Sequence, residues 1–271
     1  KLINLADAEC FKAVQKGVLA LRERFDWDGV NLAELYFESL YGPSDPQRFT
    51  PMNETVRRKF EQEAGFDPLE LFRRDGPRHW ERDRGAWRRF VDYRAGLAHR
   101  LQAQWIEALR EWRPDLDLVL THIDDRYDAR MREFLGADAA AVLPLLDRFP
   151  FTFAIEDPAT TWHLGPERYT EIARRYAALT PHRDRLAVDI NIVERYQDVY
   201  PTKKQTGTEL FQLLQFAGRA FTRVLLYFEH SIAKADYELL AAASSAVTRA
   251  QLRGDGLHVE ASAASGVRWP G

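Results

Sequence analysis

Carboxylates accompany short apolar segments at five places in this sequence, in GVNLAE, LVLTHIDD, FTFAIED, LAVDIN and VLLYFEH. Cleavage of a glycosidic bond needs one protonated carboxyl group that donates to the leaving oxygen. It also needs an ionised one that acts as nucleophile or activates water. Neighbouring carboxyl groups reach these two states when repulsion and burial separate their pKa values. The catalytic candidates are therefore Glu34, Asp189, Glu156 and Glu229.

Glu34 is the candidate for the acid/base group. It closes the apolar segment that begins at Val30. It also follows Asn31, whose amide can hydrogen-bond a sugar hydroxyl or position a carboxylate. The alternative is that Glu34 or Glu38 starts the next loop in solvent.

Asp189 differs from the other acids because it lies inside an apolar run, AVDINIV. A buried acid needs a partner, which either catalysis or a structural hydrogen bond with Asn191 would supply. Glu156, Asp157 and Glu229 have a simpler alternative, because acids at strand-to-loop junctions also cap helices.

Aromatic residues concentrate near the ends of these segments, and aromatic rings suit the C–H faces of pyranoses. Trp80 and Trp87 can reach in from a long loop. Each ring alone is explained by packing, whereas the concentration favours a sugar site. The predicted substrate-binding residues are Asn31, Tyr36, Trp80, Asp124, Tyr127, Trp162, Asn191 and Tyr227, and Tyr196 has a comparable place.

A metal site is suggested by His122, Asp124 and Asp125 in THIDD and by Glu229-His230. The seven histidines form neither HxH nor HExxH, which argues against such a site. The sequence also lacks GxGxxG, GxxxxGK[ST] and GxSxG, so nucleotide-dependent and serine-hydrolase chemistry have no motif support. Neither a metal nor a cofactor is predicted.

The elements that would position these acids repeat as strand, loop and helix. Such repeats indicate a parallel sheet, and in a closed barrel the carboxyl ends of its strands meet at one mouth. Counting a strand tail at 1–5, there are six strands where a closed barrel has eight. The expected fold is an α/β (β/α)8 TIM-type barrel that is truncated at its N-terminus, and the alternative is a complete doubly wound open sheet. The other predicted strands are 30–37, 116–123, 151–155, 186–193 and 224–228.

Two segments interrupt this regular pattern. Residues 39–85 form a long strand-to-helix insertion with a short helix at 54–64, and insertions of this size are often lids or binding loops. The last helix is expected at 234–249. After Gly254 the residues alternate in a pattern typical of an antiparallel β segment. The predicted domains are an incomplete catalytic barrel over 1–253 and the beginning of a C-terminal β segment over 254–271.

Composition narrows the choice of partners. The 271 residues carry 38 basic and 41 acidic side chains, a formal charge of −3, which gives no electrostatic case for nucleic acid or an anionic membrane. Neither a membrane span nor a signal peptide can be read in the sequence. Cys10 is the only cysteine, so no intrachain disulfide is possible and the redox compartment stays open. The oligomeric state is not predicted.

The segments ADAECFKAVQKGVLALRERFDWDGVNLAELYF and FTPMNETVRRKFEQEAGFDP resemble the glycoside-hydrolase-like barrels of bacterial exopolysaccharide systems. The likeness covers residues 1–112 and is only architectural to about 232. The family pattern of a strand D-G-[IV]-x-x-[DE]-[DE]-Y fits Asp28, Gly29 and Glu34, whereas Ala33 stands where an acid is often found.

This resemblance implies a periplasmic or extracellular glycosidase. It implies an acid/base group after the fourth strand, which here ends in Glu34, and a nucleophile after the seventh, near Asp189. The expected activity is hydrolysis of a polysaccharide or oligosaccharide by Glu34 and a partner acid from Asp189, Glu156 or Glu229. The alternatives are a carbohydrate-binding barrel without catalysis and a metal-dependent hydrolase.

Overall fold

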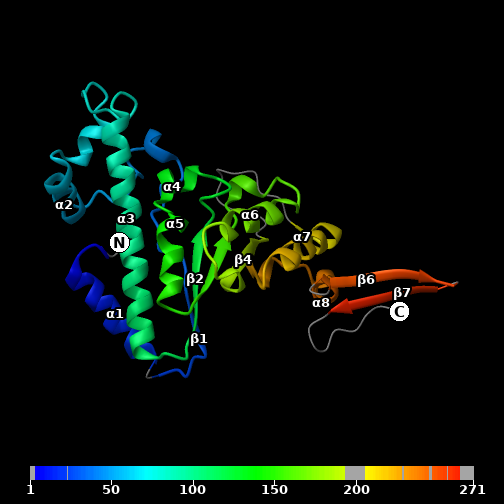
Figure 1. The fold of residues 1–271 in the computed structure, drawn as a ribbon. Helices are drawn as coiled ribbons and strands as arrows, with labels where there is room; N and C mark the ends of the chain where they lie inside the picture. The colour runs from blue at the N-terminus through cyan, green and yellow to red at the C-terminus, as the bar shows by residue number, and fades with distance from the viewer. Residues whose placement is uncertain are drawn as a thin grey trace. The chain divides into compact units, whose positions relative to one another are not determined.

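A computed structural model describes residues 4–22, 24–192, 205–227, 229–243, 246–254 and 256–262. The chain divides into two compact units, which are described separately (Figure 1). The first unit comprises Lys1–Asp125 and Ala129–Phe151, and the second comprises Arg126–Asp128 and Thr152–Gly271.

The first unit combines two parallel strands with helices. Strands β1 and β2 pair from Gly29 opposite Asp117 to Leu32 opposite Leu120. The elements are α1 (Ala8–Arg22), β1 (Gly29–Leu32), η1 (Gly42–Ser44), α2 (Glu54–Ala64), η2 (Pro68–Phe72), α3 (Arg84–Trp112), β2 (Asp117–Ile123), α4 (Arg130–Leu135), α5 (Ala139–Val142) and η3 (Leu143–Asp147).

Strand β1 is shorter than the sequence predicts. It ends at Leu32, and Glu34 has φ +57°, in the left-handed region that breaks an extended strand. The expected strand 30–37 is therefore wrong beyond Leu32, and Glu34 lies in the loop that follows β1. Asp7 caps helix α1, since its Oδ1 accepts the N–H groups of Glu9 and Cys10.

Helix α2 of the insertion lies beside α3 (Figure 1), and the side chains of the insertion and α3 form a hydrophobic core. Helix α2 occupies the predicted residues 54–64. Asn53 caps it by accepting the N–H of Val56, and Gly65 ends it at φ +79°. The buried residues of this core are Phe49, Val56, Phe60, Phe66, Leu71, Ala86, Trp87, Phe90, Val91, Tyr93 and Leu97.

Arg94 joins the insertion to the two helices α3 and α4. It lies on α3, is fully buried, and donates to the carbonyl oxygen of Thr50 at 2.7 Å and the hydroxyl of Ser39 at 3.1 Å. It also donates to the carbonyl oxygens of Glu133 and Phe134. Burial lowers the pKa of Arg94 to about 9, so the guanidinium is still charged at pH 7.

The second unit contains three parallel strands in the order β3-β4-β5 and a separate antiparallel pair, β6-β7. The elements are β3 (Thr152–Glu156), η4 (Ala159–Thr161), α6 (Arg168–Ala177), η5 (Arg183–Arg185), β4 (Leu186–Asn191), α7 (Gly207–Ala220), β5 (Arg223–Tyr227), η6 (Glu229–Ser231), η7 (Lys234–Asp236), α8 (Tyr237–Ala243), β6 (Ala246–Arg253) and β7 (Gly256–Ser262).

The parallel strands of the second unit have one face against helix α6. The rings of Phe153 and Tyr176 lie 5.9 Å apart, which places α6 on the face that carries Phe153. Side chains alternate along a strand, and partners in register share a face. The opposite face therefore carries Thr152, Ala154 and Glu156 from β3, Ala187, Asp189 and Asn191 from β4, and Arg223, Leu225 and Tyr227 from β5. We call it the polar face.

The end of the described chain corrects one prediction. The expected helix 234–249 stops at Ala243, and β6 begins at Ala246 and pairs with β7. The antiparallel β segment is confirmed, although it begins before Gly254, which turns the hairpin at φ +64°. An Ala-rich segment suits a helix by propensity, and pairing with β7 overrides that preference.

The fold class is confirmed as mixed α/β with parallel strands, and it is compatible with a partial (β/α) barrel. Five parallel strands occur in the described residues, so eight are not seen there. Of the strand tail expected at 1–5, residues 1–3 lie outside the described part, and Asn4 and Leu5 are not in a strand. None of the helices in the described ranges is long and apolar enough to cross a membrane.

Candidate functional site

Two of the predicted catalytic acids lie side by side on the polar face. The register of β3 and β4 pairs Glu156 with Asp189, at the carboxyl ends of neighbouring parallel strands. Asn191 follows on the same face of β4, and its side-chain nitrogen donates to Glu156 Oε1 at 3.3 Å. Two carboxyl groups and one amide therefore share one edge of the sheet, which is where α/β folds commonly place their ligands.

Asp189 is buried on the polar face. Its residue is 8% exposed, and the described residues donate no hydrogen bond to its carboxyl group. Burial, followed by the negative charge of Asp157, raises the pKa of Asp189 to about 6. The hydrogen bond with Asn191 that the sequence offered as an alternative is not formed, because the Asn191 amide donates to Glu156 and to the Asp157 carbonyl oxygen.

Asp157 lies next to Glu156 in the chain and faces helix α6. Its Oδ2 accepts from Arg168 Nε at 3.1 Å, Arg168 Nη2 at 2.8 Å and the Tyr169 hydroxyl at 3.0 Å. All three side chains are buried. Burial and then the Asp157 charge raise the pKa of Tyr169 well above its usual value, so the hydroxyl keeps its proton as a donor.

The Asp157 backbone also holds two of the predicted substrate-binding residues. Trp162 Nε1 donates to the Asp157 carbonyl oxygen at 3.0 Å, and Asn191 Nδ2 donates to the same atom at 3.3 Å. Trp162 is 4% exposed, so its indole fixes the loop after β3. Sequence reasoning missed Arg168 and Tyr169, because nothing in a local pattern says which distant carboxylate they bind.

The remaining candidates of the second unit are more open. Tyr227 is 50% exposed and lies opposite Asn191 on β5, on the polar face. Tyr127 packs under the guanidinium of Arg175, whose central carbon lies 5.0 Å from the ring centre. The backbone of Glu229 begins η6, while its side chain and all of Tyr196 lie outside the described part of the chain.

The other candidates belong to the first unit. Asn31 accepts a hydrogen bond from the Thr121 hydroxyl at 3.0 Å, which ties β1 to β2. Glu34 is exposed, and Tyr36 packs partly buried against the cluster around Ile123. Glu34 and the Glu156–Asp189 pair are thus in separate units.

The THIDD segment forms a buried pair at the end of β2. His122 Nε2 lies 3.3 Å from Asp125 Oδ1, and both carboxylate oxygens of Asp125 accept the N–H of Ala139. Asp124 is fully buried beside them in the chain. In the ranges that the structure describes, no group of three or more His, Cys, Asp or Glu side chains could hold a metal ion.

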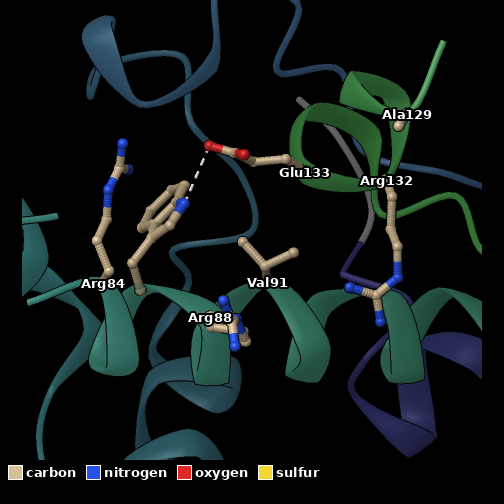
Figure 2. A pocket seen from close by; sticks show the side chains of 7 residues that line it. Arg84, Arg88, Val91, Ala129, Arg132 and Glu133 are labelled. Atoms are coloured by element: carbon tan, nitrogen blue, oxygen red, sulfur yellow. Dashed lines mark hydrogen bonds between the residues drawn. The ribbon is translucent and has the colours of Figure 1, made fainter. Parts of the chain in front are cut away.

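A separate cavity of about 380 Å³ lies in the first unit, on helix α3 (Figure 2). Trp87 lines this cavity, and Trp80 packs beside Trp87 with ring centres 6.1 Å apart, against the core of the insertion. The lining residues are Arg84, Trp87, Arg88, Val91, Ala129, Arg132 and Glu133.

The lining of this cavity carries three arginines and one carboxylate, that of Glu133. Arg132 pairs at 2.9 Å with both Asp92 and Asp138, and Glu133 accepts from Trp87 Nε1 at 3.0 Å. Arg84 and Arg88 are the other two charged groups of the lining. Asp92 and Asp138 are not among the lining residues, so the lining itself carries an excess of positive charge.

The geometry therefore singles out the polar face of the second unit, with Glu156, Asp189 and Asn191 at its edge and Asp157 behind it. Comparison with known proteins adds no further assignment to this site. No family model matches the sequence, and no curated protein matches it either.

Proposed function

We propose that this chain hydrolyses a glycosidic bond in a polysaccharide or oligosaccharide, with Asp189 and Glu156 as its two carboxyl groups. The observation that carries the proposal is the pairing of these acids on neighbouring strand ends, with the Asn191 amide bonded to Glu156. The likeness of residues 1–112 to glycoside-hydrolase-like barrels of exopolysaccharide systems supports the same reaction class.

The two acids have different environments, as this reaction requires. Asp189, with its pKa raised to about 6, keeps its proton in mildly acidic solution and donates it to the glycosidic oxygen as the C–O bond breaks. Glu156, whose Oε1 accepts a hydrogen bond from Asn191, is proposed as the ionised partner. Its carboxylate then attacks the anomeric carbon or takes a proton from the attacking water.

The exposed ring of Tyr227 offers a surface for a sugar beside these acids. It lies on the polar face, opposite Asn191. Pyranose rings present C–H bonds that pack on an aromatic face. Tyr227 is therefore proposed as a substrate-binding residue, with Asn191 orienting the carboxylate of Glu156.

The decisive experiment compares hydrolysis by Asp189→Asn and Glu156→Gln with hydrolysis by Asp184→Asn. Asp184 has an exposed side chain at the opposite end of β4, so its variant should release reducing ends at the wild-type rate. Both site variants should lose at least about 100-fold in kcat. Wild-type activity should also fall as pH rises through about 6, because Asp189 then loses its proton.

Unchanged turnover in both site variants would reject the Asp189–Glu156 pair. Glycan binding without turnover in the wild-type protein would favour the carbohydrate-binding alternative. A metal-dependent hydrolase would require stoichiometric metal in the purified protein.

Glu34 remains a second candidate for the acid/base role, because the family resemblance assigns that role to the strand end before it. Glu34→Gln should lower kcat by a similar factor if Glu34 takes part, whereas Glu38→Gln, also exposed and four residues on, should not. Equal activity of the two variants would remove Glu34 from the mechanism.

A further inference from the structure

We propose that Asp157, held by Arg168 and Tyr169, is a positioning residue that aims the Asn191 amide at Glu156 and keeps a negative charge behind Asp189. The proposal deepens the proposed function, and its structural part can be measured without any enzymatic activity.

The first support is the direction of the Asp157 side chain. Asp157 directly follows Glu156, and alternation along a strand sends such neighbours to opposite faces. Asp157 is 0% exposed, and its Oδ2 receives three hydrogen bonds from Arg168 and Tyr169 at the start of α6. Both guanidinium nitrogens donate to the same oxygen, Oδ2, so this atom is held from the side of α6 while Oδ1 accepts the backbone N–H of Asn191.

The second support is the set of contacts between Asp157 and Asn191. Asp157 Oδ1 accepts the backbone N–H of Asn191 at 3.3 Å, and the Asp157 carbonyl oxygen accepts the Asn191 side-chain amide at 3.3 Å. That amide also donates to Glu156 Oε1. Asp157 thus holds both the backbone and the side chain of Asn191. The Asn191 amide, held in this way, orients the carboxylate of Glu156.

The third support is electrostatic. The Asp157 carboxylate acts on Asp189 through a buried region, where charges are weakly screened. The charge of Asp157 adds to the effect of burial in raising the pKa of Asp189. The other ionisable groups facing this region are Glu156 on β3, Arg223 and Tyr227 on β5, and Arg168 and Tyr169 on α6.

The contacts indicate different roles for the adjacent residues Glu156 and Asp157. Glu156 faces the site and is proposed to react, whereas Asp157 faces the helix and touches no reacting atom. Loss of Asp157 should therefore change how the site titrates and how Asn191 is held, which loss of packing alone would not do.

The first measurement follows the Asp189 carboxyl carbon by NMR during a pH titration, with its signal assigned by its absence in Asp189→Asn. In Asp157→Asn the midpoint should move down by about half a pH unit or more, since one negative neighbour is gone. If the variant hydrolyses glycans, the basic limb of its pH profile should move down with it. An unchanged midpoint in folded Asp157→Asn would overturn the electrostatic part of the proposal.

The second measurement uses a milder change, because Asp157→Asn leaves the charge of Arg168 buried. Tyr169→Phe removes one donor to Asp157 and keeps the ion pair with Arg168. Hydrogen exchange of the Asn191 side-chain amide should become at least about threefold faster. Tyr176→Phe is the matched control, since it removes a buried hydroxyl from the same helix and leaves every contact of Asp157 in place.

Equal exchange in Tyr169→Phe and wild type would overturn the positioning role, whatever the fate of Asp157→Asn. The two proposals fail in different ways. A shifted Asp189 titration in a protein that cleaves no glycan rejects the hydrolase and leaves the role of Asp157 intact. Loss of turnover in Asp189→Asn, together with an unchanged Asp189 titration in Asp157→Asn, supports the hydrolase and rejects the electrostatic role of Asp157.

Discussion

Asp189 shows at the scale of one residue how a reactive group is maintained at a cost in stability. The carboxyl group lies in an apolar strand, and the described residues donate no hydrogen bond to it. Its pKa is about 6 in the folded chain and 3.8 for an exposed aspartate. A difference of roughly two units corresponds to about 3 kcal/mol.

The sign of this difference gives a stability prediction. Between pH 4 and 6 the folded chain binds more protons at Asp189 than the unfolded chain, so the free energy of unfolding falls as pH rises through this window. Asp189→Asn should therefore raise the free energy of unfolding at pH 7 by up to about 3 kcal/mol and change it little at pH 4. Urea titrations at both pH values measure the effect, with Asp184→Asn as the control that should change neither.

A loss of stability in Asp189→Asn that is equal at pH 4 and pH 7 would contradict this prediction. It would mean that the carboxyl group contributes packing or hydrogen bonding and that its ionisation carries no penalty.

The polar residues of the candidate site could be predicted from the sequence, whereas the residues that hold Asp157 behind them could not. Glu156, Asp189 and Asn191 follow from the apolar segments that carry them, since carboxyl ends of parallel strands share an edge. Arg168 and Tyr169 could not be predicted, because their partner Asp157 is a loop away and the sequence states no pairing.

At the scale of elements, the close pairing of β1 and β2 depends on Gly29. A Cβ atom at this position would lie 2.5 Å from the carbonyl oxygen of Asp117, which is a backbone atom that cannot swing away. Gly29→Ala should lower the free energy of unfolding by about 1–3 kcal/mol, because the two strands must separate.

Gly17→Ala is the control for this change. Gly17 lies in α1, and a Cβ atom at this position would have no neighbour within 4 Å, so alanine should stabilise the helix by about 0.5–1 kcal/mol. Thermal unfolding of the two variants should move in opposite directions. A neutral Gly29→Ala would show that β1 and β2 can accommodate the extra methyl group.

The insertion offers a second prediction at this scale, through Arg94. Arg94→Met would leave the carbonyl oxygens of Thr50, Glu133 and Phe134 without this donor, at a total of about 3 kcal/mol or more. Limited proteolysis should then cut residues 39–85 first. Arg100→Met, an exposed position on the same helix, should digest like the wild type. Resistance of the insertion in Arg94→Met would contradict the role of Arg94.

The elements also show which sequence signals suffice. Helix α2 occupies the residues that the sequence predicts, and the structure caps it at Asn53 and ends it at Gly65. The sequence predicts a helix where β6 begins, because the polar and apolar residues of this strand alternate only weakly. Only the pairing with β7 distinguishes a strand from a helix there. Local signals fail where a long-range partner decides the structure.

At the scale of the whole molecule, a formal charge of −3 gives a weak overall field. The Michaelis constant for an uncharged polysaccharide should therefore change less than about twofold when salt rises from about 0.01 M to about 1 M. That rise shortens the Debye length from roughly 30 Å to roughly 3 Å. Hydrolysis rates measured against substrate concentration at both salt levels test this. Because salt screens both repulsion and attraction, a large fall in the constant would indicate an acidic polymer as substrate, and a large rise a positively charged one.

The adjacent acids Glu156 and Asp157 also constrain how β3 can evolve. Glu156 lies on the polar face and Asp157 turns toward the guanidinium of Arg168, so inserting or deleting a single residue in β3 would exchange them. The exchanged strand would bury Glu156 against α6 and leave Arg168 facing the wrong carboxylate. Lineages that keep this ion pair should tolerate gaps in the loops on either side of β3 and none within it.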